Sequence, residues 1–289
     1  MTWRAWLGYG LSAVVLAAAA FAAWVWFASE AHFTSFAPPP PFTHPIATDA
    51  ATIAKGEHIA RTRGCFGCHG DKLQGDVFQE HPIMGRAVGT NLAKLTHEHS
   101  PAVFERALRH GIGSDGRALF SMPAYNFVHL SDSDVAALYA YIRSLPDTDT
   151  KLPAGWLGLP RIAIAMGDDG AIPAYLGKVP PLSWQSHPDP AVRRGEYLAM
   201  TSCTECHGFG LRGDDPFVPA GEGAPDLALV ASYSKADFAT LMRTGKAAGN
   251  RELRLMSRVA RGRFVHWTDA EVDDLYAFLL ALGQKDAQS

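Results

Sequence analysis

The feature that most constrains this chain is a short motif that occurs twice and contains every cysteine of the sequence. GCFGCHG spans residues 64–70 and SCTECHG spans residues 202–208, so each copy reads Cys-x-x-Cys-His. A Cys-x-x-Cys pair can serve as part of a zinc site, as a redox dithiol, or as the attachment site of a c-type haem. Because both motifs together use all four cysteines, none is left for a structural disulfide.

Only one of these three chemistries explains the histidine. A structural zinc site needs four ligands, and no second cysteine pair lies near either motif. A thioredoxin-like dithiol belongs beside a strand–helix–strand pattern, which is not evident here. In haem attachment the cysteines form thioethers with the porphyrin, and the adjacent histidine coordinates the iron. The motif therefore favours two covalently bound haems c, with these residues holding them: Cys65, Cys68 and His69, and Cys203, Cys206 and His207.

The N-terminal segment, residues 1–29, predicts a transmembrane anchor. Residues 5–29 contain no charged side chain, and about 20 apolar residues suffice to span a bilayer as a helix. Aromatic residues lie towards both ends of the segment, and Arg4 favours a cytoplasmic N-terminus. The alternative is a cleaved signal peptide, whose apolar core is usually only about 7–15 residues long. We expect a single-pass protein of the bacterial inner membrane, with the bulk of the chain in the periplasm.

The anchor is followed by a proline-rich linker, residues 30–49. Four consecutive prolines favour a semi-rigid spacer, which would hold the first domain off the membrane surface.

The rest of the chain is a tandem duplication, with the two motifs 138 residues apart. CHGDKLQGD matches CHGFGLRGD, and Gly111 and Gly245 each stand eleven residues before a methionine, Met122 and Met256. A fold built on such a repeat has to be built twice.

Both units predict helices, with no convincing strand. Ser131 with Asp134, and Thr268 with Glu271, have the spacing of a capping box, and an apolar stripe of helical period follows each pair. We therefore expect an all-α fold of two helical domains with a segment between them that packs against one or both. The expected boundaries are residues 50–146 for the first domain, 147–186 for the interdomain segment, 187–283 for the second domain, and 284–289 for a tail.

The second axial ligand decides whether each iron is open to small molecules or closed for electron transfer. Met122 lies 53 residues after His69, in a loop just before a capped helix. Met256 lies 49 residues after His207 and is followed by serine where Met122 is followed by proline. We interpret both methionines as distal iron ligands. The alternative for each is a methionine that fills a gap in the core.

On these features the chain resembles two class I cytochrome c domains in tandem, as in a membrane-anchored dihaem cytochrome c. The shared features are the first helices KGEHIA and RGEYLA, the Cys-x-x-Cys-His motif, the downstream methionine, and the last helices LYAYI and LYAFL. The resemblance implies that the first and last helices cross at Gly56 and Gly195, with Met122 and Met256 as distal ligands. In this family a proline carbonyl often holds the proximal histidine; the second unit has GAPDL, but the first has VGTNL, without it.

The primary hypothesis is an electron carrier and not an enzyme, which shuttles electrons between a dehydrogenase or other respiratory donor and a cytochrome or terminal oxidase. The alternatives are a dihaem peroxidase-like enzyme and a haem-based sensor, both of which need one open iron. A net charge of −3 and the lack of a basic arm argue against a nucleic-acid partner.

The segment 243–263, around Met256, has seven basic residues and one acidic residue and is expected to be a loop. This loop, with Arg254 and Arg258, predicts a docking patch for an acidic redox partner, because a positive rim near a haem edge steers association. The alternative is a solvated face in which one or two arginines neutralise haem propionates.

Overall fold

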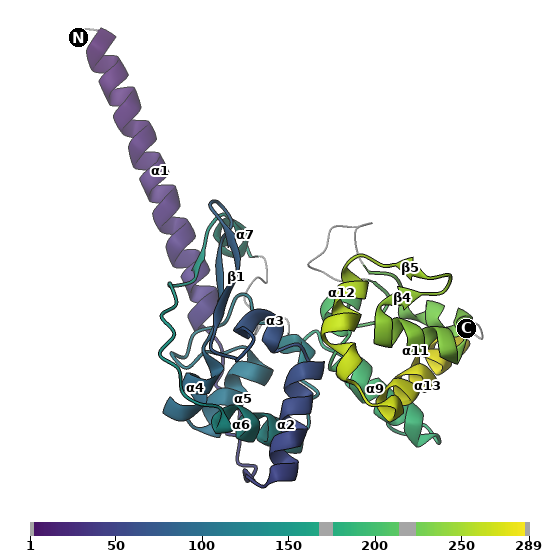
Figure 1. Cartoon of the computed structure of the whole chain (residues 1–289). Helices are drawn as coiled ribbons and strands as arrows, with labels where there is room; N and C mark the ends of the chain where they lie inside the picture. Colours follow the sequence, from purple (N-terminus) through teal and green to yellow (C-terminus); the bar gives the residue numbers. More distant parts are fainter. Residues whose placement is uncertain (1–2, 168–175, 214–223, 287–289) are drawn as a thin grey trace.

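The computed structural model describes residues 3–167, 176–213 and 224–286, and shows a long helix that stands out from two helical domains (Figure 1). This helix, α1 (Trp3–Thr34), is the one helix of the described chain that is long and apolar enough to cross a membrane. It continues past residue 29, so the first turn of the expected linker is helical.

The two domains repeat one arrangement, in which the first helix crosses the last and the Cys-x-x-Cys-His motif follows the first helix. The first domain contains α2 (Ala50–Thr62), α3 (Phe66–His69), α4 (Leu92–Glu98), α5 (Pro101–His110), η1 (Ala124–Asn126) and α6 (Asp132–Ser144). The second contains α9 (Pro190–Met200), α10 (Thr204–His207), η2 (Leu227–Ser232), α11 (Lys235–Thr244), α12 (Leu255–Gly262), η3 (Phe264–His266) and α13 (Asp269–Asp286).

The two helix crossings are as close as the resemblance implied. A Cβ atom added at Gly56 would lie 2.0 Å from the carbonyl oxygen of Ala137 in α6. At Gly195 it would lie 2.1 Å from the carbonyl oxygen of Asp274 in α13. Because real Cβ atoms do not approach other atoms this closely, only glycine permits either crossing.

The capping signals of the sequence are confirmed. The Ser131 hydroxyl accepts a hydrogen bond from the backbone N–H of Asp134 at 3.2 Å. Thr268 and Glu271 form a reciprocal capping box, in which each side chain accepts from the other residue's backbone N–H, at 3.2 and 2.8 Å.

The predicted helical class of the two domains is confirmed, but both units also contain short strands that the sequence did not indicate. In the first, β1 (Asp76–His81) and β2 (Gly85–Gly89) form an antiparallel hairpin, and β3 (Trp156–Leu157) from the interdomain segment pairs with β2. In the second, β4 (Lys246–Ala247) and β5 (Arg251–Glu252) form a short hairpin. These strands escape a search for alternating residues because they are short and because β1 is mostly exposed and interrupted by a register shift.

The interdomain segment packs against both domains, as expected. Leu176 and Val179 lie against Tyr125 of the first domain, and Trp184 packs against the core of the second. Helix α7 (Pro160–Ala165) packs against α1.

The proline-rich segment does not hold the first domain away from α1. Phe33, near the end of α1, is buried against that domain, and Phe42 and Ile46 pack against its core. Apolar side chains on both sides of the prolines therefore fix the segment to the domain surface.

Candidate functional site

The first Cys-x-x-Cys-His motif begins where α2 ends. Gly64, with φ +82°, turns the chain, and the following turn of helix α3 carries Cys68 and His69. None of the four cysteines forms a disulfide. Burial raises the pKa of Cys65 to about 11 and that of Cys203 to about 12. Thiols of this kind stay protonated near neutral pH, which is the opposite of the low pKa values that reactive dithiols show.

The zinc alternative also finds no support in the geometry. Within residues 3–167, 176–213 and 224–286, which include every cysteine and histidine, no three His, Cys, Asp or Glu side chains form a cluster that could hold a metal. Each motif therefore stands as a separate site with one histidine.

Each motif histidine is held by a backbone carbonyl. His69 Nδ1–H donates to the carbonyl oxygen of Thr90 at 2.7 Å, and His207 Nδ1–H donates to that of Pro225 at 2.8 Å. Burial lowers the pKa of both histidines and outweighs the opposing effect of these hydrogen bonds. A neutral imidazole with its proton on Nδ1 presents the Nε2 lone pair to a metal.

The departure at VGTNL is therefore of little consequence. Orienting the histidine requires a carbonyl oxygen at this position and not the proline ring. Thr90 supplies that carbonyl for His69, as Pro225 does for His207. Sequence reasoning singled out the missing proline but not Thr90 as its replacement, although Thr90 stands at the matching place in VGTNL.

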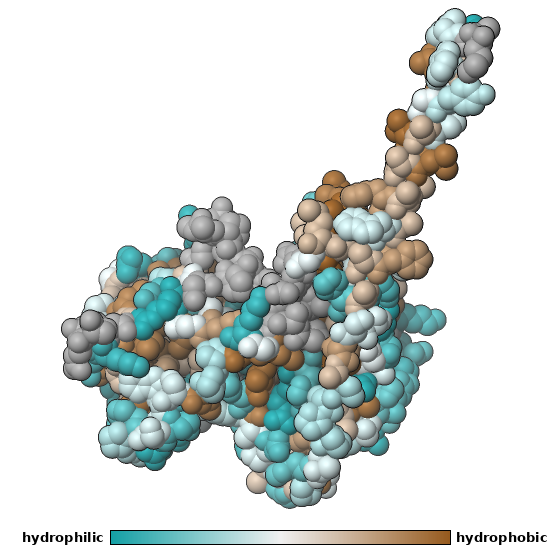
Figure 2. Space-filling model, turned by 180° about the vertical axis from the view of Figure 1, so that it is seen from behind, coloured by the Kyte–Doolittle hydropathy of each residue, from teal (hydrophilic) through white to brown (hydrophobic). Residues whose placement is uncertain are grey.

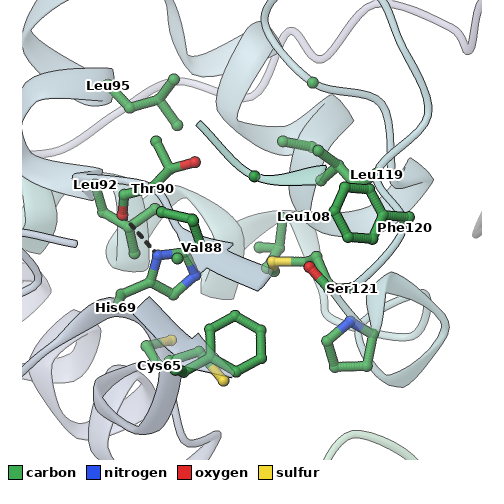
Figure 3. A pocket seen from close by; sticks show the side chains of 18 of the residues that line it. Cys65, His69, Val88, Thr90, Leu92, Leu95, Leu108, Leu119, Phe120 and Ser121 are labelled. Atoms are coloured by element: carbon green, nitrogen blue, oxygen red, sulfur yellow. Dashed lines mark hydrogen bonds between the residues drawn. The ribbon is translucent and has the colours of Figure 1, made fainter. Parts of the chain in front are cut away.

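A cavity of about 620 Å³ opens beside the first motif and is lined by Cys65, Cys68, His69 and Met122. Figure 3 shows His69, hydrogen-bonded to Thr90, on one side of the cavity and Ser121, the neighbour of Met122 in the chain, on the other. Most of the remaining lining is apolar. The volume lies within the range of about 300–1,000 Å³ that is usual for cofactor pockets.

The second motif repeats the backbone geometry of the first. Gly75 N–H donates to the His69 carbonyl at 2.8 Å, and Gly213 N–H donates to the His207 carbonyl at 2.9 Å. Leu73 and Leu211 stand at equivalent places with φ +56° and +59°. Positive φ is uncommon for leucine, so its presence in both copies indicates one loop built twice around the two histidines.

Met256 lies in a different setting from Met122. Met122 is in a loop, as expected, whereas Met256 is the second residue of α12. Its side chain is half-buried and, like that of Cys203, packs against the core of the second domain. The pairing of Met256 with His207 stays a prediction.

The segment around Met256 is also not the loop expected from its sequence. It comprises the end of α11, the β4–β5 hairpin and α12. Four of its seven basic residues form ion pairs: Arg243 with Asp269, Lys246 and Arg261 with Glu252, and Arg263 with Glu205.

The two motifs adjoin across the domain interface. Glu205, inside the second motif, and Arg263 form an ion pair of 3.0 Å and both line the cavity of the first motif. Conversely, Asn126, from the first domain just after Met122, accepts a hydrogen bond of 2.5 Å from Thr204 of the second motif. Each site thus includes side chains of the other domain.

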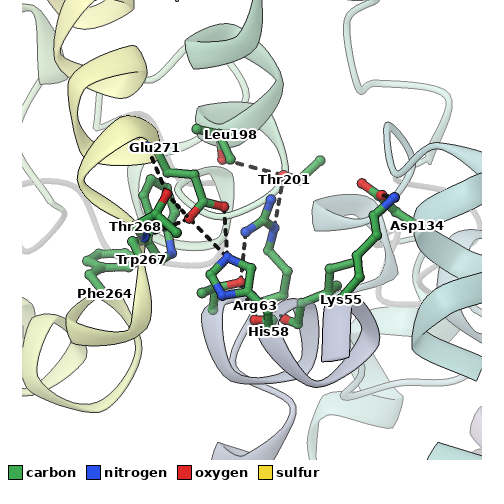
Figure 4. A network of polar contacts seen from close by, with 12 residues as sticks. Lys55, His58, Arg63, Asp134, Leu198, Thr201, Phe264, Trp267, Thr268 and Glu271 are labelled. Carbon is green, nitrogen blue, oxygen red and sulfur yellow. Dashed lines mark hydrogen bonds and ion pairs between the residues drawn. The ribbon is translucent and has the colours of Figure 1, made fainter. Parts of the chain in front are cut away.

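A polar network holds this interface together (Figure 4). Both carboxylate oxygens of Glu271 lie 2.9 Å from His58 Nε2. Burial raises the pKa of Glu271, but hydrogen bonds from His58 and Thr268 outweigh it and lower the pKa to about 2. Arg63 is buried, donates to Thr201 at 3.1 Å and stacks over Trp267. Sequence reasoning missed the roles of His58 and Arg63, because nothing in either local pattern indicates a contact with the other domain.

The donor groups of both sites fit a covalently bound haem. Each site offers two thiols outside any disulfide and one neutral imidazole, and the first site also has a cavity of suitable size. Next to the second motif, the amide nitrogen of Asn126 and the hydroxyl of Ser202 are buried without a hydrogen-bond partner, as is expected where a further polar group completes a site.

Comparison with known proteins agrees with this geometry. The cytochrome c family model matches residues 53–146 and again residues 192–283. The chain therefore belongs to the cytochrome c family, as the motif and helix pattern indicate. Cytochrome c domains hold a covalently bound c-type haem and transfer electrons.

Curated relatives are cytochrome subunits of dehydrogenases. Alcohol dehydrogenase (quinone), cytochrome c subunit, of Gluconobacter oxydans (strain 621H) is 28% identical over 85% of this chain and 60% of its own length. The fructose dehydrogenase cytochrome subunit of Gluconobacter japonicus is 28% identical over 83% and 54%. The gluconate 2-dehydrogenase cytochrome c subunit of Pantoea cypripedii is 26% identical over 82% and 61%. The chain thus spans between 54% and 61% of the length of these relatives.

Proposed function

We propose that this chain is a dihaem electron carrier, anchored by α1 in the inner membrane, that accepts electrons from a dehydrogenase on the periplasmic side and passes them to a cytochrome or terminal oxidase. The observation that carries the proposal is the meeting of the two attachment motifs at one domain interface. When bound, each haem c supplies a one-electron redox couple; the roles that follow belong to the residues of the chain.

The cysteines of each motif attach the cofactor, and the histidine is its proximal ligand. Thr90 and Pro225 keep the imidazoles oriented through the hydrogen bonds at 2.7 and 2.8 Å, and burial keeps them neutral by lowering their pKa. Met122 lines the same cavity as His69, which supports its role as distal ligand. Met256 takes that role in the second domain by its equivalent place in the repeat. With methionine as its second protein ligand, the bound iron would be closed to small molecules and its potential would be raised.

The interface provides a short path between the two sites. Arg263 lies against the first motif, since a Cβ added at Gly64 would be 2.1 Å from Arg263 Nε, and it pairs with Glu205 of the second motif. The Asn126–Thr204 hydrogen bond joins the same two regions from the other side. We infer that electrons pass directly from one domain to the other, without a mobile carrier.

The exposed guanidinium groups of Arg254 and Arg258 form the docking surface for an acidic redox partner. The structure gives neither of them an ion pair within its described residues, whereas four neighbouring basic residues are neutralised by pairing. Unpaired positive charge of this kind increases the rate at which an acidic protein associates. The names of the relatives support a dehydrogenase catalytic subunit as the donor.

The test has two parts. Denaturing mass spectrometry of the full chain is expected to show two covalently attached haems, and one haem when both cysteines of either motif are replaced by serine. The catalytic subunit of a quinone-dependent alcohol dehydrogenase or of a fructose dehydrogenase, supplied with its substrate, is then expected to reduce both haems. A chain that carries fewer than two haems, or that neither subunit reduces, would contradict the proposal.

A further inference from the structure

The base of α1 is fixed to the first domain. Phe33, 3% exposed, packs with Ala118 and Ile164, and its carbonyl accepts a hydrogen bond of 2.9 Å from Ala118 N–H. Glu30 accepts a hydrogen bond of 3.2 Å from Arg161 of α7. These contacts set the height along α1 at which the domain sits.

That height is the end of the apolar segment. The guanidinium of Arg161 lies 4.1 Å from the ring centroid of Trp26 and donates to the Ser29 hydroxyl at 2.9 Å. Residues 5–29 carry no charge, and Trp24 and Trp26 are exposed, as are the aromatic residues that mark a membrane–water interface. Helix α7 therefore lies where a membrane-spanning α1 leaves the acyl chains for the headgroups.

Exposed apolar side chains gather around this contact. We call them the apolar shoulder: Ile83 and Met84 at the tip of the β1–β2 hairpin, and Leu159 and Met166 at the two ends of α7, each between 48% and 74% exposed. The carbonyls of Ile83 and Met84 accept hydrogen bonds from the N–H groups of Leu159 and Gly158, at 3.0 and 2.9 Å. The hairpin tip and the start of α7 are therefore tied into one surface.

The shoulder continues the apolar surface of α1. Figure 1 shows α7 and the hairpin beside the lower part of α1, at the end of the first domain from which α1 projects. Figure 2, from behind, shows apolar residues continuing from the helix onto the surface at its base. An exposed apolar patch of this kind marks an interaction site, and its continuity with α1 identifies the bilayer as its partner.

We propose that the apolar shoulder sits in the headgroup–acyl boundary of the bilayer that α1 crosses, so that the first domain has a second membrane contact. Transfer of apolar side chains out of water is favourable, and interfacial elements insert about 5–10 Å into this boundary. Two contacts fix the orientation of the first domain on the membrane, which leaves the second domain to meet water-soluble partners. The proposal rests on α1 being retained as an anchor, which is part of the proposed function.

The test measures the depth of single labels in the full, haem-loaded chain. With the motif cysteines in thioether bonds, a cysteine introduced by Met84→Cys or Met166→Cys is the only free thiol. Each variant is labelled with an environment-sensitive fluorophore and reconstituted into phosphatidylcholine vesicles with or without brominated acyl chains. Val15→Cys, within the apolar segment of α1, reports on the anchor, and Ala54→Cys, exposed on α2, is the matched control.

We expect brominated lipid to quench the labels at Met84 and Met166 at least about twofold, as is appropriate for positions within about 5–10 Å of the acyl boundary. The label at Val15, deeper among the acyl chains, is expected to be quenched as well, and the label at Ala54 to stay unchanged. Quenching at Val15 without quenching at Met84 and Met166 would overturn the membrane contact and leave the anchor standing. No quenching at Val15 would overturn the anchor, and the membrane contact with it.

Discussion

The helix crossing at Gly195 gives the sharpest test of the packing that builds each site. In Gly195→Ala, the new Cβ would lie 2.1 Å from the Asp274 carbonyl oxygen and 2.6 Å from Phe278 Cβ. The first of these is a backbone atom of α13, so relief requires α9 and α13 to separate. Overpacking of this kind costs typically about 1–3 kcal/mol, and more where backbone has to move.

Alanine recovers part of this cost, because it is about 1 kcal/mol better than glycine inside a helix. We therefore expect a net loss of about 2 kcal/mol in the free energy of unfolding. For a domain of this size each kcal/mol lowers Tm by about 4–8 °C, so the loss corresponds to about 8–16 °C. Thermal unfolding of the haem-loaded protein, followed by far-ultraviolet circular dichroism, measures it.

Gly262→Ala is the matched control. Gly262 is also helical and in the second domain, but an added Cβ meets nothing within 4 Å. Its Tm is expected to stay the same or to rise slightly, since only the helix preference changes. Equal Tm values for Gly195→Ala and the wild type would show that the crossing is looser than the structure has it, and would refute the packing argument.

Three further predictions concern the interface, the docking surface and the first iron site. The pKa of Glu271 is lowered from 4.5 to about 2 in the folded chain, so its contribution to stability is present above about pH 4.5 and is lost as the pH falls towards about 2. Glu271→Gln is therefore expected to be less stable than the wild type at pH 7, and the difference in urea midpoint is expected to vanish between about pH 4.5 and 2. A difference that stays constant with pH would count against the His58 contact. Replacing Arg254 and Arg258 together by alanine is expected to slow reduction of the haems by the dehydrogenase subunit about tenfold at low salt. At about 1 M salt, where the Debye length is about 3 Å, the replacement is expected to have little effect. Stopped-flow rates of variant and wild type that differ by the same factor at both salt concentrations would exclude electrostatic steering. Met122→Leu removes a sulfur ligand while keeping an apolar side chain, and is expected to lower the potential of one haem and to let that haem bind carbon monoxide; an unchanged redox titration would show that Met122 is a packing residue.

The local features of this fold could be predicted because each depends on residues close together in the chain. The capping pairs Ser131–Asp134 and Thr268–Glu271, and the loop position of Met122, follow from short patterns. The cofactor type follows from seven-residue motifs, and the crossing at Gly195 followed from a family resemblance.

The remaining features depend on contacts between distant segments. The Glu205–Arg263 pair beside the first motif and the Asn126–Thr204 hydrogen bond form only once the two domains meet. The proline-rich segment was expected to act as a spacer, but the packing of Phe42 against the first core fixes it to the domain. In each of these cases a tertiary contact, which sequence patterns do not encode locally, decided the outcome.

The account depends most on both irons being closed by a histidine and a methionine. The measurement that tests this most directly is a carbon monoxide titration of the dithionite-reduced, purified chain, followed by absorbance. We predict no change in the spectrum of either haem, because an iron with both axial positions occupied by protein ligands has no free coordination position for carbon monoxide. Binding at one haem in two would contradict the account, and the Met122→Leu spectrum would then show whether the open iron lies in the first domain or the second.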